Sequence, residues 1–165
     1  MSLSIRGFCE SDLPTIKRLT IAGFEGVSID ENIERRFGSV AGDDWQSRKS
    51  RAIDEDANCA DGAIFVAQLD DQIVGYITTR IDEAGRVGYI PNLAVDARFR
   101  GQGIGTALIE HAVRFFCSQD LVGARIETLD QNPVGTRLYP ALGFEEVARQ
   151  IHYYQPLDGS SSTQP

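Results

Sequence analysis

Residues 90–116, IPNLAVDARFRGQGIGTALIEHAVRFF, decide the fold, because they combine one strand, one glycine-rich loop and one helix. The apolar run LAV at residues 93–95 is typical of a buried strand. Apolar side chains then recur at helical spacing, at Ile104, Leu108, Ala112 and Phe115. The glycines lie between the two elements, where the missing β-carbons let the main chain turn tightly and approach a ligand closely.

The loop at residues 100–106, RGQGIGT, is suited to bind a phosphate or pyrophosphate group. The first amides of a helix have no partner within the helix, and the helix dipole places roughly half a positive charge at that end. A Walker loop is disfavoured because no lysine follows Gly105, and a dinucleotide fingerprint is disfavoured because Thr106 stands where its last glycine is needed. A tight turn without a ligand is the alternative.

Length and composition predict a single soluble domain at residues 1–157, followed by a polar, disordered tail at residues 158–165. The chain has 165 residues, of which 42% are hydrophobic and 24% charged, which suits a chain with one sizeable core. No run approaches the roughly 18 apolar residues of a membrane span, and the amino end lacks a signal-peptide pattern. We therefore expect a cytoplasmic protein that does not bind membranes.

The net charge is −8 and the isoelectric point is near 4.7. This charge argues against binding to nucleic acid or to an anionic membrane, and it favours a cationic partner such as an amine. Cys9, Cys59 and Cys117 are odd in number and lack the spacing of metal ligands. The sequence therefore predicts neither a disulfide framework nor a metal site.

The rest of the chain has the alternation, helical spacing and turn residues of a mixed α/β protein. The strands are predicted at residues 4–8, 63–69, 72–81, 87–95, 124–129 and 144–154. The helices are predicted to start near Pro14, to follow a cap at Asp30, and to cover residues 44–57, 104–116 and 133–142.

One residue predicts an irregularity within a strand, and another predicts the start of a helix. Pro91 cannot donate a ladder hydrogen bond, so a bulge or a break in pairing is predicted within residues 87–95. Bulges are frequent beside active sites. Asn132 is predicted to cap the helix at residues 133–142.

Two motifs give the chain a family resemblance. The first is Arg100-x-x-Gly103-x-Gly105 behind the strand ending Asn-Leu-Ala-Val, and the second is Asn132 followed seven residues later by Tyr139 in RLYPALGF. Both resemble motifs of the GNAT superfamily of N-acetyltransferases, and they occur in the family's order. The resemblance extends from about residue 4 to residue 154. It implies a mixed α/β fold with a central, mostly antiparallel sheet flanked by helices.

The same resemblance implies acetyl-CoA as the acetyl donor and assigns a role to each matching position. The main chain of Leu93 and Val95 would pair with the pantetheine arm, and Asn132 would contact it. Val95 or its neighbour Ala94 would donate an N–H to the thioester carbonyl, while the loop amides would hold the pyrophosphate. The residues implied in donor binding are Leu93, Ala94, Val95, Arg100, Gly101, Gln102, Gly103, Ile104, Gly105, Thr106 and Asn132.

Acetylation of an amine by direct attack needs a neutral amine, a donor for the oxyanion and a proton for the leaving thiolate. Tyr139 is the candidate general acid, because a phenol with an ordinary pKa near 10 keeps its proton at neutral pH. The alternative is that Tyr139 is only an aromatic residue of the core.

Glu127 is the candidate base, since it resembles in placement the glutamate that some protein-acetylating members use. A carboxylate exposed to solvent, or one that binds a cationic substrate, is the equal alternative. His111 and His152 have no partner at catalytic spacing. Cys117 ends a helix, where the dipole raises a thiol pKa, so a cysteine nucleophile is disfavoured.

The leading hypothesis is transfer of an acetyl group to a primary amine in a ternary complex. The acceptor is a small molecule, a protein amino terminus or a lysine, and acyl groups other than acetyl stay open. The alternative is an acyl-CoA-binding sensor or regulatory module without turnover. Tyr139 at the motif position favours the enzyme over the module.

The acceptor wall and the carboxyl end vary most between members of the family. Residues 27–57 are expected to form one wall of the acceptor site, with aromatic residues and the arginines Arg35, Arg36, Arg48 and Arg51. Ordinary packing and a solvated face are the alternative. Many members finish with two strands, whereas this chain has one run at residues 144–154. Unless this run bends into two strands, the acceptor cleft is either more open or completed by another subunit, and the family therefore implies a homodimer.

Overall fold

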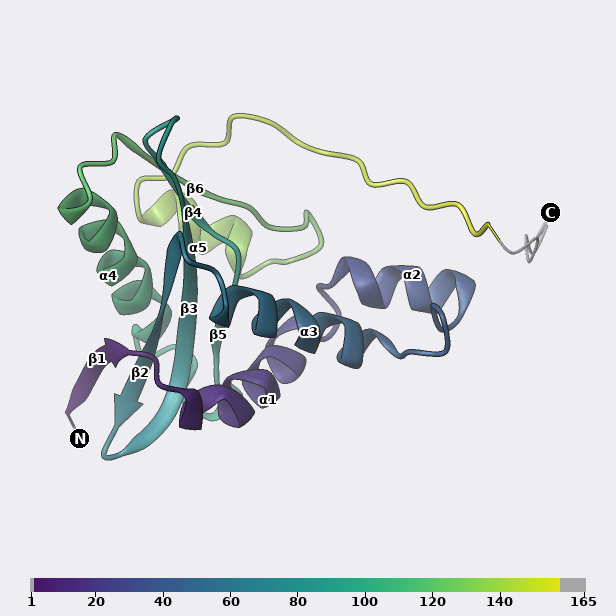
Figure 1. Ribbon diagram of the computed structural model, residues 1–165, viewed down its shortest axis with the longest axis horizontal. Helices are drawn as coiled ribbons and strands as arrows, with labels where there is room; N and C mark the ends of the chain where they lie inside the picture. The colour runs from purple at the N-terminus through teal and green to yellow at the C-terminus, as the bar shows by residue number, and fades with distance from the viewer. Residues whose placement is uncertain (1, 158–165) are drawn as a thin grey trace.

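The computed structural model describes residues 2–157 and contains a six-stranded sheet (Figure 1). The strands are β1 (Leu3–Gly7), β2 (Gly62–Leu69), β3 (Gln72–Asp82), β4 (Val87–Ile90), β5 (Leu93–Val95) and β6 (Gly123–Ile126). The helices are α1 (Leu13–Phe24), α2 (Ile29–Phe37), α3 (Trp45–Ala57), α4 (Ile104–Ser118) and α5 (Gly135–Ala141).

The sheet follows the order β1-β2-β3-β4-β6, and β5 pairs with β3 as a second segment after β4. All of these pairs are antiparallel except β4 with β6, which run parallel because α4 carries the chain back between them. A parallel pair needs such a crossover. The predicted fold class, a mixed α/β protein with a mostly antiparallel sheet flanked by helices, is confirmed.

Helices cover both faces of the sheet, with α4 on one face and α1 and α3 on the other (Figure 1), and a hydrophobic core lies under each layer. On one face, α4 buries Leu108 and Phe116 against Ile77 of β3. On the other face, α1 and α3 bury side chains against Tyr76. Neighbouring residues of β3 thus serve different cores, because side chains alternate along a strand. The register of β3 therefore fixes which face of the sheet each of its side chains occupies.

Residues 144–154 do not form the last strand that their alternation predicts, so this prediction is wrong. The segment leaves α5 and runs extended towards α2, where the rings of Tyr154 and Phe37 lie 5.2 Å apart (Figure 1). A strand forms only when its main-chain groups find partners in a sheet, which this segment lacks among residues 2–157. Three of its apolar side chains are at least 75% exposed: Val147, Ile151 and Tyr153.

Several predicted boundaries move by a few residues. The strand predicted at residues 124–129 ends at Ile126, and the helix predicted from Pro133 begins at Gly135. α2 begins at Ile29 with Ser28 in the N-cap position, so Asp30 lies in the first turn and is not the cap. The tail predicted at residues 158–165 lies outside the described residues. Between residues 2 and 157, no helix has both the length and the apolarity to cross a membrane.

Candidate active site

A one-residue bulge separates β4 from β5. Arg80 pairs with Tyr89 and Ile77 pairs with Leu93, so three steps along β3 face four steps along the partner strand. The extra residue falls at the Pro91–Asn92 step, where Pro91 has no N–H to donate. The break in pairing predicted from Pro91 is therefore confirmed.

The bulge determines which main-chain groups of β5 face away from β3. Thr78 N donates to Asn92 O at 2.9 Å, and Asp96 N donates to Val74 O at 2.8 Å. Hydrogen-bonded pairs alternate along an antiparallel ladder, so Ala94 faces β3 while the N–H and C=O groups of Leu93 and Val95 point to the opposite edge. No other strand within residues 2–157 covers that edge.

β4 and β6 diverge at the same point. The last pair of this parallel ladder joins Ile90 to Ile126, after which β5 stays with β3 while the chain continues from Glu127 away from the sheet. Glu127 is exposed, and it follows Arg125, whose guanidinium lies 5.0 Å from the centre of the Tyr89 ring. The structure thus places the predicted base at the divergence of the two strands, beside the bulge.

The glycine loop leads directly from this edge into α4. Gly101 and Gly103 have φ angles of 77° and 78°, a left-handed conformation that favours glycine. No described residue accepts a hydrogen bond from the amides between Gly101 and Thr106, and no side chain caps α4. Free amides at the positive end of a helix are suited to bind an anion, and the pyrophosphate site of this loop stays a prediction.

The remaining loop residues divide between support and exposure. Arg100 Nε donates to Val95 O at 3.2 Å, which ties the loop to the free edge of β5. Gln102 is exposed, whereas the side chain of Ile104 is buried in the α4 core, so Ile104 can offer a ligand only its main chain. A β-carbon on Gly105 would lie 3.5 Å from Leu138, which brings α5 next to the loop.

Asp96 fixes the turn between β5 and the loop. Its carboxylate accepts hydrogen bonds from Arg98 at the main-chain N (3.0 Å), Nε (3.1 Å) and Nη2 (2.7 Å). The side-chain hydrogen bonds from Arg98 are the main cause that lowers the pKa of Asp96 from 3.8 to about 2. The carboxylate therefore stays charged and holds the turn at neutral pH.

Asn132 lies two residues before Val134, the N-cap position of α5, so it is not the cap that the sequence predicts, although its side chain bonds the first amide of α5. Its Oδ1 accepts from the main-chain N of Val134 at 3.1 Å and of Gly135 at 3.3 Å, while its Nδ2 donates to Thr128 Oγ1 at 2.9 Å. The side-chain amide is thus bonded on both sides within the protein. Its predicted contact with pantetheine stays a prediction.

Tyr139 lies half-buried on α5 and packs against the α4 core. Its ring is 6.4 Å from that of Phe144 in an edge-on arrangement. Burial raises the pKa of Tyr139 from 10.0 to about 12, and no described side chain bonds its hydroxyl. Tyr139 therefore keeps its proton at neutral pH, as a general acid must. No hydrogen bond between described residues joins Tyr139 to Glu127.

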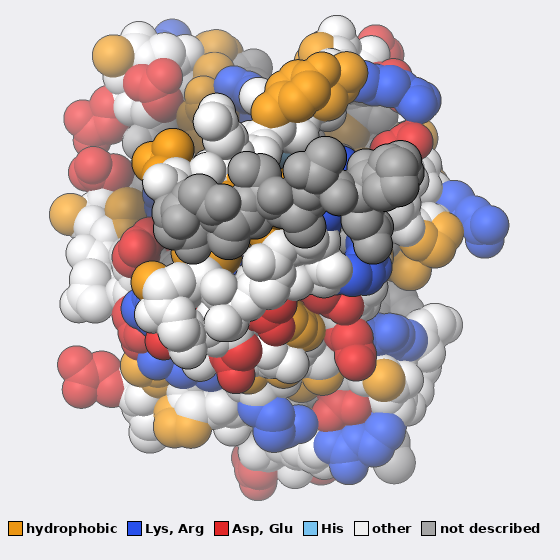
Figure 2. All heavy atoms as spheres, turned by 90° about the vertical axis from the view of Figure 1, so that its right-hand side faces the viewer, with side chains coloured by type: hydrophobic (Ala, Val, Ile, Leu, Met, Phe, Trp, Pro, Cys, Tyr) orange, Lys and Arg blue, Asp and Glu red, His pale blue; other side chains and the backbone are white. Residues whose placement is uncertain are grey.

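The predicted acceptor wall is held together by its own ion pairs. Arg48 is 11% exposed at the side chain and donates to the main-chain oxygens of Asp30 (2.8 Å) and Asp43 (2.7 Å). It also lies 3.3 Å from a carboxylate oxygen of Glu34. Figure 2 shows basic and acidic side chains interspersed on this side of the molecule. Arg48 thus ties α3 to α2, while Trp45 is buried.

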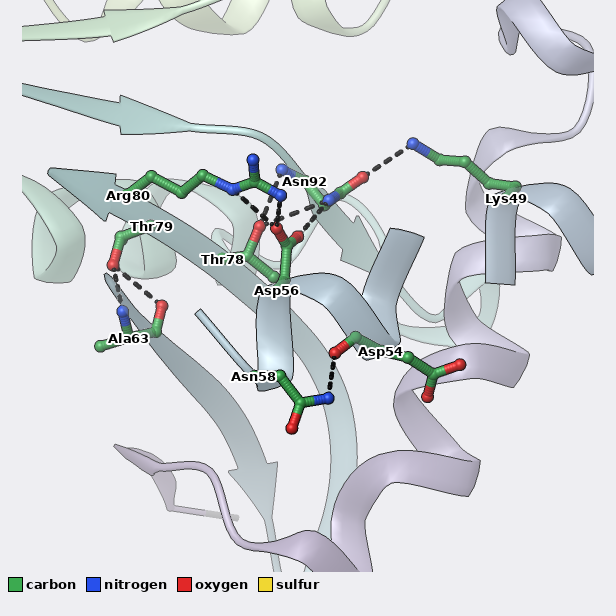
Figure 3. A network of polar contacts seen from close by, with 9 residues as sticks. All are labelled: Lys49, Asp54, Asp56, Asn58, Ala63, Thr78, Thr79, Arg80 and Asn92. Carbon is green, nitrogen blue, oxygen red and sulfur yellow. Dashed lines mark hydrogen bonds and ion pairs between the residues drawn. The ribbon is translucent and has the colours of Figure 1, made fainter. Parts of the chain in front are cut away.

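A buried polar network that the sequence does not predict lies behind the bulge. Lys49 and Asp56 of α3 both bond to the side chain of Asn92, and Asp56 also binds Arg80 of β3 (Figure 3). The one local signal of this network in the sequence is Asn92, a polar residue directly after Pro91 in an otherwise apolar strand. Its partners, far away in the sequence, gave no signal. Among residues 2–157 no group of three His, Cys, Asp or Glu side chains is arranged to hold a metal ion.

Residues 28–144 match the family model described as the Acetyltransferase (GNAT) family, and the chain belongs to this family. It is similar to N-alpha-acetyltransferase 30 of Xenopus laevis, with 36% identity over 54% of this chain and 34% of that protein. It is also similar to an N-alpha-acetyltransferase of Sulfurisphaera tokodaii, with 32% identity over 57% of this chain and 63% of that protein. The chain thus spans less than two thirds of the length of these relatives.

Solved structures share the fold. An aminoglycoside N-acetyltransferase in complex with CoA has a TM-score of 0.69 at 20% identity, over 93% of this chain and 95% of that one. The ribosomal-protein-S18-alanine N-acetyltransferase of Escherichia coli has a TM-score of 0.65 at 21% identity, over 96% and 87%. The predicted family and fold are confirmed, and the predicted enzyme class, an N-acetyltransferase, agrees with the family and with these relatives.

Asp96 provides a test of the turn before the loop. Because its folded-state pKa is lowered, its charged form stabilises the fold fully above pH 3.8, and this contribution is lost as the pH falls through about 2. Asp96→Asn is expected to lower the free energy of unfolding at pH 7, and the difference from the wild type should shrink between pH 4 and pH 2. Urea unfolding across this pH range measures it. Asp71→Asn, the same change at an exposed turn, is the control, and a constant difference would contradict the assignment.

Proposed function

We propose that the protein transfers an acetyl group from acetyl-CoA to a primary amine by direct attack within a ternary complex. The observation that carries this proposal is the unpaired edge of β5 leading directly into a loop of free amides. An extended pantetheine arm needs main-chain partners like those of a strand, and a pyrophosphate needs amides at a helix start. The two requirements meet in one continuous strip of main chain, residues 93–106.

The donor would be held mainly by main chain. Leu93 offers its N–H and C=O groups and Val95 its N–H group at the free edge, while Val95 O already accepts a hydrogen bond from Arg100, which supports this edge. Gly101, Gln102, Gly103, Ile104, Gly105 and Thr106 offer the loop amides. For the thioester carbonyl, the ladder favours Val95 over Ala94 as the N–H donor, because Ala94 lies at a position bonded to β3. An N–H aimed at the developing oxyanion stabilises it.

The chain's own residues would move two protons. Tyr139 would donate its phenolic proton to the leaving sulfur, because a phenol is protonated at neutral pH and Tyr139 lies in the family's motif position. Glu127 would accept a proton from the amine, directly or through a water molecule. Its exposed position beside the diverging strands supports access from solvent. The amine nitrogen would then bond to the acetyl carbon as the carbon–sulfur bond breaks.

The acceptor class stays open between small amines and protein amino termini or lysines. The relatives include enzymes named for protein amino termini, and one structural neighbour is named for aminoglycosides. All of these acceptors are amines, and the net charge of −8 supports a cationic substrate. The location in the cytoplasm stays a prediction from the sequence.

The first test combines donor binding with turnover. Calorimetric titration with acetyl-CoA and CoA, followed by thiol release over a panel of amines and amino-terminal peptides, should show binding and turnover on one acceptor class. Tyr139→Phe should then lower kcat by about 100-fold without weakening acetyl-CoA binding, because it removes only the acid. Tyr153→Phe, at an exposed tyrosine, is the control. Full turnover by Tyr139→Phe at neutral pH would contradict its role.

Two other outcomes of this experiment are informative. Binding of acetyl-CoA without turnover on any acceptor would support the alternative, a sensor or regulatory module. Absence of binding by the wild-type protein would contradict the donor site itself.

Glu127→Gln tests the base. At low pH most of the amine substrate is protonated and depends on a base to remove its proton. Without the carboxylate, turnover should therefore fall most at the acidic end of the pH range. The pH profile of kcat/KM measures this effect. Glu110→Gln removes an exposed carboxylate of α4 and should leave the profile unchanged. A Glu127→Gln profile that parallels the wild type at every pH would remove Glu127 from the mechanism.

We also propose a homodimer, supported by the exposed apolar side chains of residues 144–154 and by the edge of β6 that no strand within residues 2–157 covers. Light scattering of the full chain should give twice the mass of one chain. Ile151→Glu should shift the mass towards one chain, because a charge in an apolar interface is costly. Leu3→Glu, at an exposed apolar residue of β1 on the opposite edge of the sheet, is the control. A wild-type chain of single mass at micromolar concentration would contradict the dimer.

A further inference from the structure

Asn92, the residue of the bulge, is bonded at each of its polar groups (Figure 3). Its Oδ1 accepts from Lys49 Nζ at 2.8 Å, and its Nδ2 donates to Asp56 Oδ2 at 2.7 Å. Its main-chain N donates to Thr78 Oγ1 at 3.1 Å, and its main-chain O accepts from Thr78 N at 2.9 Å. Asn92 is 4% exposed, so these partners replace water.

The partners of Asn92 are themselves fixed from several elements. Asp56 Oδ1 accepts from Arg80 Nε at 3.0 Å and from Nη2 at 2.6 Å, which joins α3 to β3. Lys49 Nζ lies 4.0 Å from the centre of the Phe24 ring at the end of α1, a cation–π contact. The bulge is therefore held from one side by α1, α3 and β3 together. A rotation of Asn92 would break contacts with both α3 residues at once.

This network acts on the only irregular step in the pairing of β4 and β5 with β3. Without the extra residue, the register of β5 would shift by one, and a shift of one residue exchanges the groups that face the neighbouring strand for those that face away. Leu93 and Val95 would then direct their N–H and C=O groups into the sheet. The groups proposed to bind the donor exist at a free edge only while the bulge persists.

Stability alone is a poor explanation for such a network. Buried ion pairs contribute little net stability compared with apolar packing, and their best-attested use is to specify one arrangement. An apolar side chain at position 92 could fill the space between α3 and the sheet without any bond to Lys49 or Asp56. What the polar atoms add is direction, because each hydrogen bond fixes the side chain at a defined angle.

We infer that Asn92 is a positioning residue, held by Asp56 and Lys49, which keeps the bulge in place and thereby presents the edge of β5 to the acyl-CoA donor. The inference rests on the proposed function of this edge. It also assigns α3 a second task besides bounding the acceptor side, since the same helix supplies both partners of Asn92. Loss of the network should weaken donor binding even though its residues lie outside the strip of main chain proposed to bind the donor, residues 93–106.

Two matched substitutions test the inference. Asp56→Asn puts an amide where both partners, Asn92 Nδ2 and Arg80, are donors, so one of the two contacts must break. Asp12→Asn makes the same change at Asp12, which is 5% exposed against 6% for Asp56 and also accepts two hydrogen bonds from one arginine, Arg6. Asp12 lies before α1 and has no contact with the bulge. The pair therefore separates a general loss of stability from an effect on the edge.

The readouts are the dissociation constant of CoA by calorimetry and the melting temperature of each variant. Asp56→Asn is expected to weaken CoA binding about tenfold, as for the loss of one or two main-chain hydrogen bonds, while Asp12→Asn changes it less than about twofold at a similar loss of melting temperature. Asn92→Ala removes all three side-chain hydrogen bonds of the bulge residue and should act like Asp56→Asn. Lys49→Met keeps the stem over Phe24 and provides a further variant if Asn92→Ala does not fold.

The outcomes distinguish a failure of the positioning role of Asn92 from a failure of the proposed donor site. Equal CoA affinity of the wild type, Asp56→Asn and Lys49→Met would overturn the positioning role while leaving the donor site in place. An equal loss of affinity in Asp12→Asn would overturn it too, because the effect would then follow stability. A wild-type protein that does not bind CoA would instead contradict the proposed function.

Discussion

The one-residue bulge between Tyr89 and Leu93 changes which main-chain groups face the neighbouring strand. In a regular ladder without this extra residue, Leu93 and Val95 would direct their N–H and C=O groups towards β3. The bulge coincides with the last pair between β4 and β6, so β5 keeps β3 as its partner on one side while its other side is open. Main-chain groups of Leu93 and Val95 thus point to an edge without a strand partner. Because buried main-chain groups need hydrogen-bond partners, a ligand can supply them.

The second requirement, an anion-binding loop, is met at the end of the same strand. Because α4 is the crossover between the parallel strands β4 and β6, its amino end must lie where β5 ends. Gly101 and Gly103 allow the turn between strand and helix, and Asp96 with Arg98 fixes its start. One strand–helix junction therefore brings together a strand edge, a set of amides and the positive end of a helix dipole.

The two faces of the sheet carry different chemistry around this junction. On the α4 face the surroundings are apolar, and burial there raises the pKa of Tyr139. On the α3 face the bulge is backed by charged side chains that satisfy one another. Satisfied polar networks in a buried setting favour one geometry, because any displacement leaves a donor or an acceptor without a partner. The apolar surroundings on the α4 face and the polar network on the α3 face thus meet at the edge of β5.

The sequence by itself determined the features whose signals are local. The glycines at residues 101 and 103 and the break in pairing at Pro91 each act within a few residues, and they lie in the structure where the sequence predicted them. Asn132 bonds the start of α5, but the helix begins two residues later than predicted. Only the tertiary structure decided which edge of β5 is open, that Asp56 reaches Asn92 across 36 positions, and that residues 144–154 find no strand partner within the described chain. The physical reason is that a ladder or a buried ion pair requires a second segment, and alternation along one segment does not specify which segment that is.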